Sequence, residues 1–338
     1  LTRGTPVNDA PVVTGTPPLP VQVAEDTTAP AGTSVTDLFS PSFSDKTDAV
    51  PGGSSADSLA GVVITKNDTP ASEGTWVVIH ADGSHTPVGN VSETNGLVVS
   101  ASDKLAFVPA PNWNGTPEPL TAHLIDSSSG AVTTGTHIDA TQNGGTTAIS
   151  TATVDLPAIV QQVNDAPLAT GNVTLPPVPD NAADPSGASV AALFTPVFND
   201  QTDAVPGGSS ANNLAGVAIV GNTVPASEGV WRYSTDGGAT WTAVTTNVSD
   251  TNATVLPSSA TVSFLPAPNW NGTPPALVTR AIDSSGGPVT AGTGVDVSAN
   301  GGTTAIAAET QSLSTVVTPV NDAPLATGNV TLPPVPDN

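Results

Sequence analysis

Cysteine and methionine are absent from this sequence of 338 residues, and basic residues are scarce. Without cysteine, no disulfide can stabilise the fold, and no thiolate can bind a metal or act as a nucleophile. Lysine and arginine together number 6 against 29 aspartates and glutamates, which gives a net charge of −23. Such a chain lacks the basic face that nucleic acid or an anionic membrane surface requires. Its unpaired carboxylates are expected to face either water or a hard cation such as Ca²⁺.

Long hydrophobic runs are missing as well, since no apolar segment approaches the ~18 residues that a membrane-spanning helix needs. Aromatic residues make up only 4% of the chain, whereas glycine (32) and proline (34) are abundant. Proline and glycine interrupt helices and favour turns. Valine, isoleucine, leucine and phenylalanine recur in alternating segments, which disordered chains usually lack. This composition predicts many short strands joined by turns.

Internal repeats are the main feature of the sequence. The spacing between copies is 155 in the first half of a repeat and 157 in the second half, which indicates that two residues were gained between about 242 and 265, most simply in a hairpin loop. The repeated motifs are VNDAP (7–11, 163–167 and 320–324), TDAVPGGSSA (47–56 and 202–211), PASEG (70–74 and 225–229), PAPNWNGTP (109–117 and 266–274) and NGGTTAI (143–149 and 300–306).

The repeats divide the chain into four parts. We assign 1–10 to the tail and linker of a preceding repeat, 11–166 and 167–323 to two β-domains, and 324–338 to the start of a third repeat. The opening residues, Leu-Thr-Arg-Gly, do not form a signal peptide, and the last residue falls inside a repeat. We therefore expect the sequence to be an interior part of a longer chain.

Each repeat has the hydrophobic pattern of β-strands. Segment 303–318 alternates small or apolar residues with polar ones and predicts one long strand, as does its counterpart 146–160. Loops rich in Gly, Pro, Asn and Ser separate the strands and favour an all-β fold of tandem antiparallel β-sandwich domains. Further strands are predicted at 61–65, 75–79, 104–108 and 120–126, and single helical turns at 34–39 and 189–194.

The motifs VNDAP and PAPNWNG resemble those of the cadherin-like, Ig-like repeats of giant bacterial surface adhesins, the RTX-type and VCBS-type biofilm proteins. In that family an NWNG-like turn precedes the last strands, and a long closing strand leads into VNDAP at the junction to the next repeat. Both features occur here in this order, and the resemblance covers essentially the whole chain. It implies extracellular domains at the bacterial cell surface, strung end to end, with Ca²⁺ near the junctions. The repeat is longer than the roughly 100 residues of a simple Ig-like domain, so extra strands or long loops are expected.

Candidate metal ligands lie at the junctions. Short Asp and Asn side chains at a bend offer the oxygen ligands that Ca²⁺ prefers, and bound Ca²⁺ would bridge two domains and stiffen the hinge. The alternative is a simple Asx turn before proline. The junction residues are Asn8 and Asp9, Asn164 and Asp165, and Asn321 and Asp322, each followed by a second group at Glu25 and Asp26, at Asp180 and Asn181, or at Asp337 and Asn338.

A second acidic pair, Asp45 and Asp48, recurs as Asp200 and Asp203 beside the TDAVPGGSSA motif. If a metal lies inside each domain, this pair is the preferred source of its ligands. Solvated loop carboxylates are nevertheless the interpretation that we favour for these residues. The same interpretation applies to two further matched pairs, Asp126 with Asp283 and Asp139 with Asp296.

Catalytic patterns do not recur between the repeats. All four histidines lie in the first repeat, and none has a histidine counterpart in the second, which excludes a shared histidine-based catalytic or zinc site. No glycine-rich phosphate loop follows a strand and opens a helix. We therefore expect no enzyme activity. Segment 234–241 (STDGGATW) fits the Asp-box pattern of β-hairpins, which we interpret as a turn signal only.

Together these features predict a structural extender, the stalk segment of a large cell-surface adhesin or fibre, with calcium stiffening its domain junctions. The alternative is that the repeats are themselves adhesive or self-assemble laterally into an extracellular fibre or matrix. The expected partners are neighbouring repeats, other copies of the chain, or surface glycans. Nucleic acid and insertion into a membrane are not expected.

Overall fold

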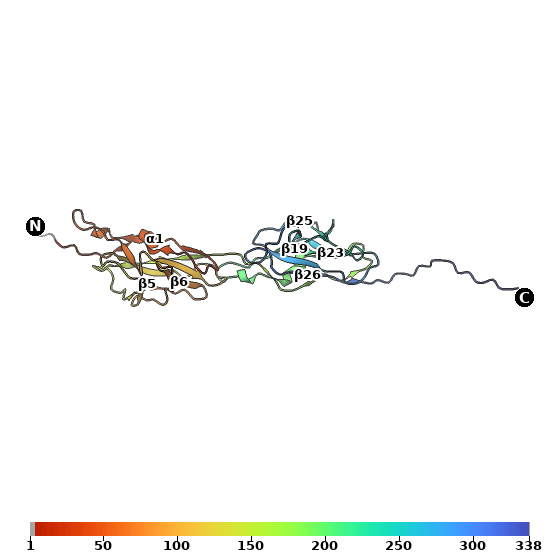
Figure 1. The fold of residues 1–338 in the computed structure, drawn as a ribbon, viewed down its shortest axis with the longest axis horizontal. Helices are drawn as coiled ribbons and strands as arrows, with labels where there is room; N and C mark the ends of the chain where they lie inside the picture. The colour runs from red at the N-terminus through yellow and green to blue at the C-terminus, as the bar shows by residue number, and fades with distance from the viewer. Residues whose placement is uncertain (1–3, 338) are drawn as a thin grey trace. The chain divides into compact units, whose positions relative to one another are not determined.

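The computed structural model describes residues 4–337, and strands dominate it, with 36% strand and 7% helix. The prediction of a β-rich fold is thereby confirmed. Predictions that involve residues 1–3 or Asn338 lie outside the described residues. The chain forms two compact units, coloured red to green and green to blue in Figure 1. Unit 1 comprises the described residues up to Asn164 together with Gln201–Ala211, and unit 2 comprises Asp165–Asp200 and the described residues from Asn212 onward.

Two antiparallel sheets make up most of unit 1. Its elements are β1 (Val12–Val13), β2 (Val21–Ala24), β3 (Thr33–Ser34), α1 (Val35–Phe39), η1 (Ser40–Ser42), β4 (Phe43–Ser44), η2 (Lys46–Asp48), β5 (Leu59–Lys66), β6 (Gly74–Ile79), β7 (His85–Pro87), β8 (Gly96–Ser100), β9 (Lys104–Pro109), β10 (Leu120–Asp126), β11 (His137–Ile138), β12 (Ile149–Leu156), β13 (Ala158–Gln161) and, from the later segment, η4 (Gln201–Asp203). One sheet has the order β11-β8-β5-β10-β12 and the other the order β3-β9-β6-β7.

Unit 2 repeats this plan. Its elements are β14 (Leu168–Ala169), β15 (Val173–Thr174), β16 (Val178–Pro179), β17 (Ala188–Ser189), α2 (Val190–Phe194), η3 (Thr195–Val197), β18 (Phe198–Asn199), β19 (Leu214–Gly221), β20 (Gly229–Ser234), β21 (Thr242–Ala243), β22 (Ala253–Pro257), β23 (Thr261–Pro266), β24 (Leu277–Asp283), β25 (Gly292–Val295), β26 (Gln311–Ser314) and β27 (Val317–Thr318). Its larger sheets have the orders β15-β26-β24-β19-β22-β25 and β17-β23-β20-β21. The strands predicted at 61–65, 75–79, 104–108 and 120–126 and their counterparts are confirmed as β5, β6, β9 and β10 and as β19, β20, β23 and β24.

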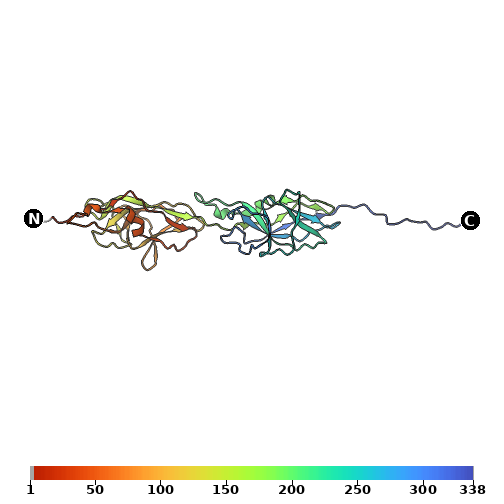
Figure 2. The same ribbon diagram turned by 90° about the horizontal axis from the view of Figure 1, so that it is seen from above.

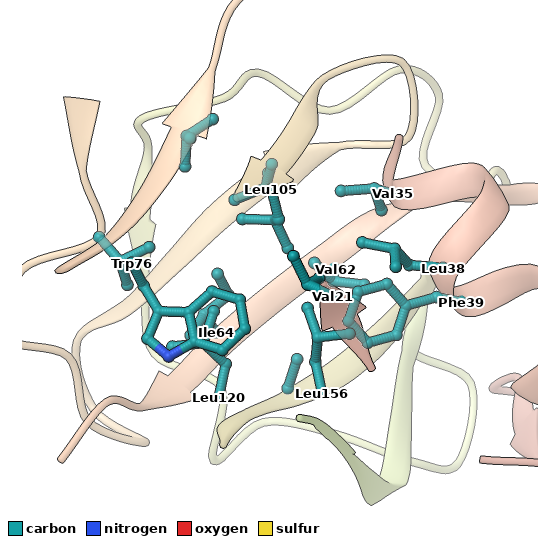
Figure 3. Close-up of a cluster of buried hydrophobic side chains, with 14 of the residues drawn as sticks. Val21, Val35, Leu38, Phe39, Val62, Ile64, Trp76, Leu105, Leu120 and Leu156 are labelled. Atoms are coloured by element: carbon teal, nitrogen blue, oxygen red, sulfur yellow. The ribbon is translucent and has the colours of Figure 1, made fainter. Parts of the chain in front are cut away.

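One hydrophobic core receives side chains from both sheets of unit 1. Trp76 on β6 lies beside Ile64 on β5 and Leu120 on β10 (Figure 3), and its ring meets the Phe107 ring edge-on at a centroid distance of 5.4 Å. Apolar residues at alternate strand positions therefore point to a shared interior, as the period of a strand dictates. Unit 2 has the equivalent core with the equivalent aromatic pair, Trp231 and Phe264.

The short helix α1 closes one side of this core with Val35, Leu38 and Phe39 (Figure 3). The Ser34 hydroxyl oxygen accepts a hydrogen bond from the Asp37 amide at 3.0 Å, which satisfies one of the free N–H groups of the first turn. The predicted helical turns are thus confirmed. In the described part of the chain the α-helices have five residues each, and none could span a membrane.

The predicted long strand at the end of each repeat is wrong. In the first repeat, Pro157 divides segment 146–160 into β12 and β13, because proline has no N–H to donate to a sheet. The chain then changes partners, since β12 pairs antiparallel with β10 whereas β13 pairs parallel with β2. Segment 303–318 of the second repeat holds only β26 and β27.

The predicted place of the two-residue gain also needs correction. Val77 pairs with Pro87 in the first repeat, and its counterpart Arg232 pairs with Ala243 in the second. Val77 and Arg232 are 155 positions apart, whereas their partners Pro87 and Ala243 are 156 positions apart. The spacing between the repeats has therefore already grown by one residue at the end of the β20–β21 hairpin. The other extra residue lies before Ser249, whose bridge to Asn252 matches the bridge from Ser92 to Asn95. One residue was therefore gained inside the hairpin and one after it.

The described residues after β27, 319–337, contain no helix or strand (Figure 2). They include a sequence identical to the one that forms β14, β15 and β16 in unit 2. Those three strands pair with β18, β26 and β27, which all come later in the same repeat.

Candidate metal centre

Three carboxylates meet in unit 1 and form what we call the acidic cluster: Asp45, Asp48 and Asp57. Asp45 follows β4, Asp48 is the last residue of η2, and Asp57 precedes β5. One oxygen from each lies within 4.8 Å of the others. Asp45 and Asp48 are only 4% and 7% exposed. Because water reaches these two carboxylates poorly, their negative charges need compensation from within the site.

Hydrogen bonds fix the geometry of the cluster but leave one oxygen without a partner. The Asp57 amide donates to Oδ2 of Asp45 at 2.5 Å, and the Ser127 hydroxyl donates to Oδ1 of Asp57 at 2.9 Å. The Ser54 hydroxyl donates to the Asp48 carbonyl oxygen. Oδ1 of Asp45 is buried and, among the described residues, has no hydrogen-bond partner. A buried, unpartnered carboxylate oxygen is costly unless a proton or a cation neutralises it.

The junction residues Asn8 and Asp9 join this cluster. The Asp9 amide donates to Oδ1 of Asp48 at 3.1 Å, and Nδ2 of Asn8 donates to the Thr147 carbonyl oxygen at 3.0 Å and to Oδ2 of Asp126 at 3.4 Å. The side-chain oxygen of Asn8 is also buried without a partner among the described residues. The structure thus combines two groups that the sequence predicts as separate sites, the junction and the pair Asp45 and Asp48.

Asp48 and Asp57 of the cluster line a cavity of about 270 Å³, most of whose lining side chains carry oxygen. Carboxylates, a carboxamide oxygen and hydroxyls are hard ligands, and no histidine or cysteine is among them, so the donor set suits Ca²⁺ rather than zinc. The lining residues are Pro6, Val7, Asn8, Asp48, Ser54, Ser55, Asp57, Ser127 and Ser128.

Electrostatic repulsion within the cluster acts chiefly on Asp45. Burial raises the pKa of the Asp45 carboxyl, and the negative charges of Asp48, Asp126 and Asp57 raise this pKa further. The hydrogen bond from the Asp57 amide has the opposite effect. No ion pair between residues 4 and 337 involves a member of the cluster. A bound cation would supply the missing positive charge.

Glu25 and Asp26, predicted to act with Asn8 and Asp9, lie elsewhere in unit 1. Glu25 is buried and accepts hydrogen bonds from the Val163 amide at 2.5 Å and from Nδ2 of Asn114 at 3.0 Å. Asp26 is exposed, and its carboxylate accepts a hydrogen bond from the Asn112 amide at 2.7 Å. Hydrogen bonds from within unit 1 therefore engage both carboxylates, and the structure does not bring them to the acidic cluster.

The second repeat carries the same residue types with one exchange, because Asn212 occupies the position of Asp57. The Asn212 amide donates to Oδ2 of Asp200. Asp200, Asp203 and Asp283 are all buried, and Asn164 and Asp165 are partly buried. Asp180 matches Glu25 and accepts a hydrogen bond from the Val320 amide at 3.1 Å. Asn181, Asn321, Asp322 and Asp337 are exposed.

The interpretation of the matched aspartates as solvated loop carboxylates is wrong for Asp45, Asp48, Asp126 and their counterparts, which are buried. Asp126 is fully buried at the end of β10. Asp139 and Asp296 are exposed as expected, and hydrogen bonds from Thr141 and Ser298 lower the pKa of each carboxyl. The sequence analysis did not select Asp57, because its counterpart in the second repeat is Asn212 and not an aspartate.

The Asp box in unit 2 is a hairpin, as predicted. The Asp236 carboxylate accepts hydrogen bonds from the Thr240 amide at 2.9 Å and the Thr240 hydroxyl at 2.6 Å, which hold the pKa of Asp236 far below its ordinary value. The Arg232 guanidinium lies 4.2 Å from the centre of the Trp241 ring, a cation–π contact beneath the turn. These contacts account for the motif structurally.

Searches with models of known protein families and among curated proteins find no match to this chain.

Proposed function

We propose that this chain is a structural extender, a stalk segment of a bacterial cell-surface adhesin or fibre. In this proposal β-sandwich domains follow one another in tandem, and Ca²⁺ rigidifies them at their junctions. The observation that carries the proposal is the acidic cluster, in which two buried carboxylates and one partly buried carboxylate converge from three segments without a basic partner among the described residues. Near-identical repeats support it further, because copying a domain adds length rather than new chemistry.

The position of the cluster gives Ca²⁺ a mechanical role. Asn8 and Asp9 precede the first strand of unit 1, whereas Asp45, Asp48 and Asp57 belong to its body. A cation that takes ligands from both groups fixes the entering chain to the domain and removes freedom from the linker. Asn164 and Asp165 hold the same places in the second repeat. The proposal gives the chain no catalytic role.

Thermal unfolding and small-angle X-ray scattering test this proposal. We expect a higher Tm in millimolar CaCl₂ than in EDTA, because a cation that binds only the folded state stabilises it by about 2.7 kcal/mol at 100 times its Kd. We also expect a larger radius of gyration and a narrower distribution of lengths with Ca²⁺, since stiff linkers hold neighbouring domains apart. Both measurements use the full chain.

Matched variants separate site binding from general screening of charge. Asp48→Asn keeps the size of the side chain and removes one cluster charge, so it should lose most of the Ca²⁺ response. Glu118→Gln makes the same change in charge at an exposed position outside the cluster and should keep the full response. A Tm and scattering curve that do not respond to Ca²⁺, or an equal response in both variants, would contradict the proposal.

A further inference from the structure

His123 on β10 lies inside unit 1 between two hydrogen-bond acceptors. The residue is 3% exposed, its Nδ1 lies 2.7 Å from the Ser150 carbonyl oxygen, and its Nε2 lies 3.0 Å from Oε2 of Glu93. A carbonyl and an ionised carboxylate can only accept, and a neutral imidazole has a single N–H to donate. Both contacts are therefore hydrogen bonds only when the ring carries two protons and a positive charge. The Glu93 side chain is half-exposed, so water stabilises its ionised form.

The second repeat places a permanent cation at the same position. Arg280 is the counterpart of His123, and Asp250 is the counterpart of Glu93. Nε of Arg280 donates to Oδ1 of Asp250 at 2.8 Å, and Nη1 of Arg280 donates to the Ala307 carbonyl oxygen at 3.3 Å. A guanidinium keeps its charge throughout the pH range in which proteins fold. Both units therefore set a cation between a carboxylate and a backbone carbonyl, but only the cation of unit 1 can lose its charge near neutral pH.

This contact joins β10 to two other segments of unit 1. Glu93 lies in the turn before β8, and its carbonyl oxygen accepts a hydrogen bond from the Ala140 amide at 2.7 Å. Ser150 is the second residue of β12, and its hydroxyl oxygen accepts a hydrogen bond from the Leu124 amide at 2.9 Å. Ala140 is fully buried in an apolar cluster that is separate from the main core. The buried residues of this cluster are Val63, Val98, Ile125 and Ala140. Release of Glu93 from the ring would therefore loosen the turn that holds Ala140 in the cluster.

The charge of this contact depends on His123 and Glu93 alone. Among residues 4–337, Glu93 is the one carboxylate within 4.0 Å of a His123 ring nitrogen. The residues opposite His123 in the sheet, Val63 on β5 and Thr153 on β12, are uncharged. The other charged or titratable groups of the surrounding elements each have a different partner. They are Lys66 on β5, Asp126 on β10, His137 on β11, Asp139 after β11 and Asp155 on β12.

We propose that the contact of His123 with Glu93 and Ser150 is a pH-sensitive latch in unit 1, closed while the ring is doubly protonated and open once the ring is neutral. Loss of one ring proton leaves either the Ser150 carbonyl oxygen or the Glu93 carboxylate without its donor. Because the ring is deeply buried, water does not replace that hydrogen bond without cost. The matching contact of Arg280 in unit 2 has no such transition. Neither His123 nor Glu93 belongs to the acidic cluster, so the latch is independent of the proposed Ca²⁺ binding.

The direction of the pH effect follows from these hydrogen bonds. The doubly protonated ring makes two hydrogen bonds in the folded state that the unfolded chain lacks. Their stabilisation is therefore present at acidic pH and is lost as the pH rises through the range in which imidazole titrates, about 5 to 8. A single proton changes the unfolding equilibrium constant by at most about tenfold per pH unit.

Nitrogen NMR of the imidazole rings tests the protonation state directly. In the full chain in EDTA at about pH 6, we expect both ring nitrogens of His123 to carry protons. The resonances that disappear in His123→Gln identify this ring. One protonated and one bare ring nitrogen at this pH would overturn the proposal, because a neutral ring cannot close both contacts.

Hydrogen exchange resolved by peptide follows the two units of the full chain separately. Raising the pH from about 6 to about 8.5 in EDTA should lower the protection factors of segments 92–98 and 138–150 by up to about tenfold per pH unit. The protection factors of the counterparts, 249–255 and 295–307, should stay nearly constant. Equal changes in both units, or no change in unit 1, would overturn the proposal.

Variants assign the pH response to this contact. His123→Arg combined with Glu93→Asp installs in unit 1 the pair that unit 2 already has, so the protection of segments 92–98 and 138–150 should no longer fall as the pH rises. His123→Gln is uncharged at every pH, so the protection of these segments should already be reduced at about pH 6. His85→Gln, at an exposed histidine on β7, is the control and should keep the full pH response.

A pH response that persists in both His123 variants would overturn the proposal, with circular dichroism melting confirming that each variant is folded. The comparison of the two units within the original chain decides the question even where a variant does not fold.

Discussion

At the scale of single residues, the Asp45 carboxylate combines deep burial with three negative neighbours and one oxygen that lacks a hydrogen bond among the described residues. Each of these conditions favours the protonated form or a bound cation over the bare carboxylate. In a cation-free buffer at neutral pH the folded state therefore carries an electrostatic cost at this position. The same cost makes the site receptive to a cation.

We predict that Asp45→Asn has effects of opposite sign in the two buffers. In EDTA the variant should be more stable than the original chain, because it removes a repelled charge while its side-chain oxygen still accepts from the Asp57 amide. In CaCl₂ it should be less stable, because a ligand is lost. Urea unfolding in both buffers measures the two differences.

The pH dependence has a definite direction. The folded-state pKa of Asp45 lies above its unfolded value, so lowering the pH through the folded pKa protonates the folded protein first and relieves the repulsion. In EDTA, the difference in unfolding free energy between Asp45→Asn and the original chain should therefore shrink as the pH falls from neutrality through that pKa. An advantage that stays constant or grows would show that repulsion at Asp45 is not its cause.

The residues of the candidate site were only partly predictable from the sequence. Repetition identified Asn8, Asp9, Asp45 and Asp48, but it hid Asp57, whose counterpart is asparagine. The contact between Asn8 and Asp126 spans 118 positions. No local pattern encodes a contact that sheet pairing creates over such a distance.

At the scale of elements, the first residue of β6 is a glycine for steric reasons. Gly74 has a φ of +147°, and a Cβ there would lie 2.4 Å from the Val108 carbonyl oxygen and 2.6 Å from the Phe107 ring. Gly229 repeats this geometry in unit 2. A side chain would therefore push β6 away from β9, the strand that carries Phe107 into the core.

We predict that Gly74→Ala destabilises unit 1 by about 2 kcal/mol or more, because it combines a forbidden backbone angle with a clash against rigid backbone. Gly83→Ala is the control. Gly83 also has a positive φ, but its Cβ would meet nothing within 4 Å, so a cost of only about 1 kcal/mol is expected. If urea unfolding shows that Gly74→Ala and Gly83→Ala lose the same unfolding free energy, the steric explanation is contradicted.

The sequence predicted β5, β6, β9 and β10, but it missed β8. In β8, Leu97 and Val99 face the main core while Val98 joins a second apolar cluster on the other face of the sheet. A strand covered on both faces shows no alternation, and a short apolar run does not distinguish a strand from a helix. The long terminal strands failed for another reason, because proline and a change of partner interrupt them.

At the scale of the whole molecule, the net charge of −23 makes self-repulsion a general cost of folding. We predict that raising NaCl from about 10 mM to about 150 mM in EDTA increases the Tm, because the screening length falls from about 30 Å to about 8 Å. Circular dichroism melting measures the shift. At the higher NaCl concentration, millimolar Ca²⁺ should still add stability, whereas a Ca²⁺ effect that disappears there would indicate screening alone.

Loop 202–211 groups with unit 1, although repetition places it in the second repeat. That loop has the same sequence as 47–56 yet packs on Asn114, while its twin faces solvent. Identical sequences carry identical local preferences, so the difference arises only from what lies next to each copy. Domain boundaries drawn from repetition alone cannot detect such an exchange.

The parallel pairing of β2 with β13 decides how unit 1 resists a pull on its two ends. β2 follows the short strand β1 near the start of unit 1, β13 is the last strand of the first repeat, and four residue pairs hold β2 and β13 together. Because the strands run in the same direction, tension draws them past each other lengthwise and loads every hydrogen bond of the ladder at once. Antiparallel strands would peel apart one bond at a time. Unit 2 has the same arrangement in β15 with β26 and in β16 with β27, so each domain meets tension with its terminal strands in shear.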